Sequence, residues 1–169
     1  PAQEPDTEMV IEGTRSGSGA AVVSLNPAAA ELTTVDVVKI LKPSIVQIVS
    51  ELAAMGFSNS ALPPTGVGTG VILDQQGHIL TNNHVVENGR KFTVDLTDGR
   101  LFDAVLVGAD KATDIAVLKI VPDGRPLNLK QVQTVDSDTL RTGDLAFAVG
   151  YPLGLDQTLT MGVISGLNR

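Results

Sequence analysis

A series of short segments rich in β-branched residues, between residues 45 and 121, constrains the fold of this chain more than any other feature. Apolar and polar residues alternate at every position of 91–96, the period that places one set of side chains on each face of a strand. Segments separated by glycine-containing turns roughly every dozen residues are typical of a β-barrel or sandwich. We therefore expect an all-β fold. The expected strands are 45–52, 70–74, 78–81, 91–96, 101–107 and 115–121.

A short helix is expected just before the first strand. Thr33 or Thr34 can cap its beginning, and Pro43 stops it. Its apolar face should consist of Val35, Val38 and Leu41. Residues 1–32 have no clear period and favour a linker or extended arm, with a short apolar patch at 20–25.

Two further strands, 145–149 and 158–165, follow a long connection. Two strands alone form at best a marginal hairpin, with edges and apolar faces left exposed. We expect them to begin a second β-unit that this chain leaves incomplete. The expected division is therefore a linker or arm at 1–32, an N-terminal β-barrel with its leading helix at 33–125, and a linker with the start of a second barrel at 126–169.

The composition argues against nucleic-acid binding and excludes cysteine-based chemistry. The chain has 12 basic and 19 acidic residues, a formal charge of −7, whereas nucleic-acid-binding proteins usually carry a basic face. Only five aromatic residues are present, so base-stacking platforms are not expected either. With no cysteine there is no disulfide, no thiolate nucleophile and no cysteine-based zinc site. We expect no metal and no organic cofactor.

The sequence contains two histidines that could do chemistry. His78 follows a turn and is interpreted as an exposed strand residue, whereas His84 stands where a strand gives way to a turn or short helix. Asp114 opens an apolar strand and should be partly buried, so it needs a partner; Asp110 is expected to be exposed. A buried carboxylate can orient an imidazole that acts as a general base. A structural His84 and a strand-capping Asp114 are the alternative that the residues alone leave open.

Three segments, taken in order, resemble the HtrA/Deg family of trypsin-like serine proteases. They are GVGTGVILDQQGHILTNNHVV at 66–86, TDIAVLKI at 113–120, and GDLAFAVGYPLGL with TMGVISGLNR within 143–169. The resemblance covers roughly residues 33–169. It implies a chymotrypsin-like double β-barrel, here a complete N-terminal barrel plus the first strands of the second. It also implies that His84 is the general base and Asp114 the carboxylate that orients it.

The family's nucleophile belongs to a Gly-Asn-Ser-Gly-Gly segment, which does not occur in this sequence. Ser137 and Ser165 lack the glycine-flanked turn that would expose an attacking hydroxyl and its oxyanion donors. We therefore expect this chain alone to be inactive, with the serine supplied by a missing or separate segment. Thr69, where relatives often have serine, is one smaller departure.

The resemblance further implies a serine endopeptidase of protein quality control that cleaves unfolded or misfolded polypeptides. It implies a homotrimer or larger assembly in the periplasm or cell envelope, with residues 1–32 fitting an arm beside a removed signal or membrane anchor. Its partner would be the remainder of the protease domain, if that is a separate chain. Two alternatives stay open: a non-catalytic truncated relative that binds polypeptide or joins family assemblies, and a small β-barrel in which the His and Asp are incidental.

Overall fold

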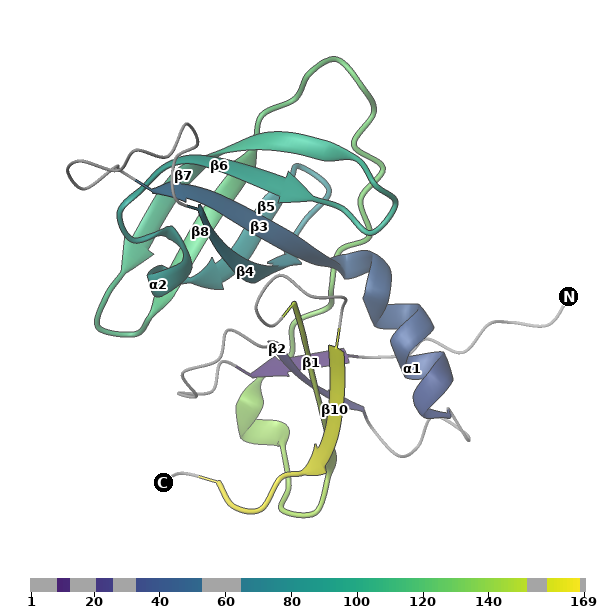
Figure 1. Cartoon of the computed structure of the whole chain (residues 1–169). Helices are drawn as coiled ribbons and strands as arrows, with labels where there is room; N and C mark the ends of the chain where they lie inside the picture. The colour runs from purple at the N-terminus through teal and green to yellow at the C-terminus, as the bar shows by residue number, and fades with distance from the viewer. Residues whose placement is uncertain (1–8, 13–20, 26–32, 53–64, 152–157, 168–169) are drawn as a thin grey trace, which may run out of the picture.

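The structure, a computed structural model, describes residues 9–12, 21–25, 33–52, 65–151 and 158–167 (Figure 1). Within these residues the chain forms a closed β-barrel and a four-stranded sheet. The barrel strands are β3 (Ile45–Leu52), β4 (Thr65–Ile72), β5 (His78–Asn82), β6 (Gly89–Asp95), β7 (Leu101–Asp110) and β8 (Ile115–Ile120). The sheet contains β1 (Met9–Glu12), β2 (Ala21–Leu25), β9 (Leu145–Gly150) and β10 (Thr158–Val163).

The barrel confirms the all-β expectation for residues 45–121. Its strands pair antiparallel in the order β3-β4-β5-β8-β7-β6, and β6 returns to β3 to close it. Alternation directs every second side chain inward, as in β8, where Ala116, Leu118 and Ile120 are fully buried. Closure leaves no free edge among these six strands.

Two barrel strands are longer than the apolar pattern indicated. β4 begins at Thr65 rather than 70, and β7 continues to Asp110 rather than 107. The β4 extension is rich in glycine and has no side-chain period, but its backbone pairs with β3 as far as Glu51 opposite Thr65. Main-chain pairing, which the side-chain pattern does not encode, therefore sets these ends.

The helix α1 (Thr34–Leu41) begins as expected, with Thr33 as its N-cap. Thr33 and Asp36 form a reciprocal capping box. The expected apolar face was wrong in part, because Val37 and Leu41 are buried whereas Val35 is 60% exposed. These two buried residues are four apart and so share one side of the helix. A short 3-10 turn, η1 (Lys42–Ser44), carries Pro43 into β3.

Parts of the segment expected to be a linker or arm are strands. Residues 9–12 and 21–25 form β1 and β2, and β2 pairs with β9 from Ala21 opposite Val149 to Ser24 opposite Ala146. The apolar patch noted at 20–25 largely coincides with β2. The other residues of 1–32 lie outside the described part of the chain. The three-part division of the chain otherwise stays a prediction.

A second cluster of buried residues joins the sheet to the barrel, with α1 packed against both (Figure 1). Phe147 and Val149 of β9 contribute from the sheet, and Ile45 and Val71 contribute from the barrel. The buried members are Val37, Leu41, Ile45, Val71, Val132, Phe147 and Val149. Among the described residues, no helix has the length and apolar character that crossing a membrane would require.

Candidate active site

The register between β5 and β8 brings His84 and Asp114 together. Asn82 at the end of β5 lies opposite Ile115 at the start of β8. The chain therefore leaves β5 beside the point where it enters β8, and the next residues on each side become neighbours. The main-chain N–H of Asn83 donates to the carbonyl of Asp114 at 3.0 Å, which continues the ladder by one bond.

His84 is carried on α2 (Asn83–Val86), a single helical turn held down by the barrel core. Val85 and Val86 are buried at 6% and 4% exposure, while the His84 side chain remains 47% exposed. The apolar side of α2 thus anchors the turn, and the imidazole lies at the surface. The imidazole is therefore firmly held and accessible from the solvent.

The carboxylate of Asp114 contacts His84 twice. Its Oδ2 lies 2.8 Å from Nδ1 of the ring, and its Oδ1 accepts the His84 main-chain N–H at 2.9 Å. An ionised carboxylate can only accept hydrogen bonds, so Nδ1 carries the proton and the neutral ring presents an unprotonated Nε2. Nε2 has no hydrogen-bond partner within the described residues. The lone pair on Nε2 is therefore available to accept a proton.

Several hydrogen bonds favour the ionised form of Asp114. Desolvation is the largest single influence on its pKa and raises it, but the bonds from the His84 main chain, the His84 ring and the Asn82 amide together outweigh that influence. The net result is a pKa below the usual aspartate range. The carboxylate is therefore charged at neutral pH, as an orienting acceptor needs to be. At 43% exposure its side chain is partly buried, as the sequence indicated.

Asn82 is a site residue that the sequence analysis missed. Its Nδ2 lies 3.2 Å from both the main-chain carbonyl and Oδ2 of Asp114. Asp114 itself adopts φ +56°, in the left-handed region that few non-glycine residues occupy. An asparagine directly before a helical turn is an ordinary N-cap signal, so nothing local pointed to a contact 32 residues away.

A second link joins the two segments that carry the pair. Lys111, in the turn before Asp114, forms an ion pair of 2.6 Å with Glu87, which follows α2. Asp110 is exposed, as expected, and accepts hydrogen bonds from the Thr113 hydroxyl and the Ala112 N–H. The Thr113 hydroxyl therefore bonds to Asp110.

His78 also pairs with a carboxylate, but within its own hairpin. Its Nδ1 lies 2.5 Å from Oδ2 of Asp74, whose Oδ1 accepts the His78 main-chain N–H at 3.0 Å. The His78 side chain is 36% exposed, so the expectation of an exposed strand residue holds only in part. This pair closes the β4–β5 turn at the other end of β5 from Asn82.

Neither serine weighed from the sequence joins the pair. Ser137 begins the 3-10 turn η2 (Ser137–Thr139), and Ser165 follows β10. Within the described part of the chain, the His84 ring makes its hydrogen bond to Asp114 alone. The same residues contain no group of three acidic or histidine side chains placed to hold a metal ion.

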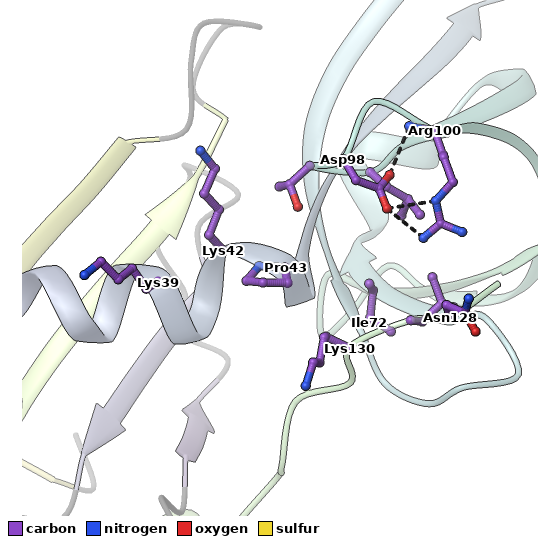
Figure 2. A pocket seen from close by; sticks show the side chains of 11 residues that line it. Lys39, Lys42, Pro43, Ile72, Asp98, Arg100, Asn128 and Lys130 are labelled. Atoms are coloured by element: carbon purple, nitrogen blue, oxygen red, sulfur yellow. Dashed lines mark hydrogen bonds and ion pairs between the residues drawn. The ribbon is translucent and has the colours of Figure 1, made fainter.

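A hollow of about 380 Å³ lies apart from the pair, between the α1–η1 segment and the Thr97–Arg100 side of the barrel. Its lining includes the apolar residues Pro43, Ile72, Leu96 and Leu129. Figure 2 shows Lys39, Lys42 and Lys130 extending from its rim in different directions, while Asp98 is held by Arg100. The three lysine side chains do not converge, so their ammonium groups do not form one anion-binding site in the hollow.

Comparison with known proteins shows which family the chain is similar to. The trypsin-like peptidase domain family matches residues 68–169. Over 110 residues the chain is 49% identical to the periplasmic pH-dependent serine endoprotease DegQ of Escherichia coli, covering 64% of this chain and 24% of the relative. It is 47% identical over 104 residues to the periplasmic serine endoprotease DegP of Escherichia coli, covering 61% and 21% of the two chains.

A solved structure of the HtrA-type protease AlgW with a tripeptide superposes with a TM-score of 0.69 at 36% identity, covering 82% of this chain and 41% of that one. The matched region spans about a quarter of the curated relatives. These likenesses, together with the closed barrel, confirm the all-β, chymotrypsin-like fold. The chain belongs to the HtrA/Deg family of trypsin-like serine proteases.

Proposed function

We propose that this chain supplies the general base and its orienting carboxylate to a serine endopeptidase. One observation carries the proposal: the 2.8 Å contact between Nδ1 of His84 and Oδ2 of Asp114, which leaves Nε2 free at the surface. The relatives it resembles are serine endoproteases by name, which supports the same reaction class.

The geometry supports a two-step acyl transfer. Nε2 of His84 takes the proton of a serine hydroxyl as its oxygen attacks the carbonyl carbon of the scissile peptide bond. The imidazolium then gives that proton to the leaving amine, and a water repeats the sequence to release the acyl group. Asp114 holds Nδ1–H throughout and stabilises the positive charge that forms on the ring.

The remaining parts of the reaction belong to residues outside this sequence. The serine nucleophile and the oxyanion donors would come from a further segment of the second barrel. The substrate class that family membership supports is unfolded or misfolded polypeptide, in protein quality control. A homotrimer or larger assembly and a periplasmic or cell-envelope location belong to the same proposal.

A hybrid enzyme tests the base directly. The 110 matched residues of Escherichia coli DegQ would be replaced by those of this chain, and hydrolysis of casein and labelling of the serine by a fluorophosphonate would be followed. His84→Ala should lower kcat by at least about 10⁴-fold, because the hydroxyl loses its proton acceptor. His78→Ala is the matched control, since it removes the other Asp-paired histidine, and it should retain most of the activity.

A second measurement uses the chain itself. In ¹⁵N-histidine-labelled protein, with signals assigned through the two alanine variants, His84 should show a protonated Nδ1 and an unprotonated Nε2 at neutral pH. The opposite tautomer would contradict the proposal. A hybrid that folds and binds casein without hydrolysing it or reacting with the phosphonate would favour the non-catalytic, polypeptide-binding alternative.

A further inference from the structure

We infer that Asn82 is a positioning residue that holds Asp114 in the conformation required to orient His84. The inference rests on the proposed function, because it assigns a role to Asn82 in that reaction. Within the described residues, the side-chain amide of Asn82 bonds to Asp114 and makes no hydrogen bond to the His84 ring. Its effect would pass through Asp114.

The first observation is the direction of the Asn82 amide. The residue is the N-cap of α2, where asparagine normally accepts a hydrogen bond from the first turn, yet its side chain makes no capping bond. Nδ2 instead lies 3.2 Å from two oxygens of Asp114, the main-chain carbonyl and Oδ2. Both oxygens only accept, so the donor end of the amide must face them.

The second observation is that Asp114 performs the capping that Asn82 leaves undone. Oδ1 of Asp114 accepts the main-chain N–H of His84, the second residue of α2. Asp114, rather than the N-cap residue Asn82, thus caps α2, and Asn82 bonds to Asp114 instead. The carboxylate reaches α2, and the amide of the capping position reaches back to the strand that carries the carboxylate.

The third observation is the backbone of Asp114. At φ +56° it occupies the left-handed region that few non-glycine residues adopt. The Asn82 amide bonds to the main chain and the side chain of Asp114 at once, and the Asn83 N–H adds a bond to the same carbonyl. These bonds tie the unusual backbone to a single direction of the carboxylate.

Asn82→Ala tests the inference in this chain without any catalysis. The ¹³C signal of the Asp114 carboxyl group should titrate at higher pH, because a donor to the ionised form is lost. The titratable and charged groups of the adjoining segments, His84, Glu87, Lys111 and Asp110, are unchanged by the substitution. Asn83→Ala is the matched control: it removes the neighbouring side chain, keeps the main-chain bond, and should leave the titration unchanged.

The DegQ hybrid supplies the functional readout. Asn82→Ala should lower kcat about tenfold, the loss expected for one hydrogen bond to a charged group, and leave KM unchanged. Asn82→Asp, the same size but without donors, should behave no better than alanine. Asn83→Ala should match the unaltered hybrid.

The outcomes separate the two proposals. If His84→Ala abolishes hydrolysis but Asn82→Ala leaves both kcat and the Asp114 titration unchanged, the positioning role is wrong and the proposed function stands. If His84→Ala has no effect, the proposed function fails whatever Asn82 does. An equal fall in activity in the Asn82→Ala and Asn83→Ala variants would show that the Asn82 amide has no specific role beyond the structure of the turn. That result would overturn the inference.

Discussion

Two aspartates show how differently the same barrel treats a carboxylate. The pKa of Asp114 is lowered, because the hydrogen bonds from His84 and Asn82 outweigh the opposing and individually larger effect of desolvation. The pKa of Asp95, in β6, is raised by burial and further by the charge of Asp98. As pH rises, the contribution of Asp114 to the free energy of unfolding therefore increases, whereas that of Asp95 decreases.

For Asp114 the folded-state pKa lies below the unfolded value of about 3.8. Its stabilisation is present above that pH and is lost as pH falls through the folded-state pKa. Asp114→Asn should lower the free energy of unfolding at pH 7 by only about 0.5–1 kcal/mol, since the side chain is 43% exposed and screened. Urea unfolding between pH 7 and 3 should show this difference shrinking on the acid side; a difference that grows there would contradict it.

For Asp95 the sign is reversed. Its folded-state pKa lies above the unfolded value, so the stability it provides when protonated is lost as pH rises through the folded-state pKa. Asp95→Asn should raise the free energy of unfolding at pH 7 and have no effect below about pH 3.8. The same titration series measures it, and a destabilised Asp95→Asn variant at pH 7 would exclude this account of Asp95.

At the scale of elements, the packing of β4 against α2 determines where His84 lies. A Cβ on Gly68 would stand 2.5 Å from both Cγ atoms of Val85, the residue after His84. A Cβ on Gly66, on the same face of the strand, would meet nothing within 4 Å. The absence of a side chain at residue 68 is therefore what allows α2 to seat against the barrel.

Gly68→Ala should force Val85 outward and cost about 1–3 kcal/mol of stability, the usual range for overpacking. Because His84 adjoins Val85, its ring signals should shift in the same variant. Gly66→Ala is the matched control and should stay within about 0.5 kcal/mol. Thermal and urea unfolding with proton NMR would measure both effects, and equal stability of the two variants would disprove the close contact.

At the scale of the whole molecule, Thr69 connects the barrel to the sheet. Its hydroxyl accepts the main-chain N–H of Tyr151, which follows β9, at 2.9 Å, and its carbonyl accepts the Thr81 hydroxyl at 2.7 Å. Thr69 is 5% exposed, so water offers little replacement for a lost bond. A serine at this position would keep the hydroxyl, which explains in physical terms why either residue suits it.

Thr69→Val should lower the free energy of unfolding by about 1–3 kcal/mol, because the Tyr151 N–H loses this acceptor while the shape of the side chain is kept. Thr69→Ser should lose much less. Hydrogen exchange should locate the weakened protection at Tyr151, between the barrel and the sheet. Equal stability of the valine and serine variants would show that this bond contributes nothing to joining them.

Local pattern predicted the barrel well because strand alternation is a property of neighbouring residues. The period of 91–96 and the turn at Asp98–Gly99 were sufficient to place β6 and β7. The face of α1 and the ends of β4 and β7 were less well predicted, since each depends on which partner the element packs or pairs with. The local pattern does not predict β1 and β2 as strands, because β2 pairs with β9, more than a hundred positions away.

The candidate site was likewise predictable from the sequence only in part. The amino-acid sequence by itself determined the all-β class, the candidates His84 and Asp114 and, through resemblance, the family, because alternation and motifs are written in contiguous residues. Only the tertiary structure decided that these two side chains meet, that Asn82 turns from capping α2 to holding Asp114, and that Thr69 connects barrel to sheet. Those contacts depend on strand register and on one left-handed backbone angle, which arise when distant segments pair.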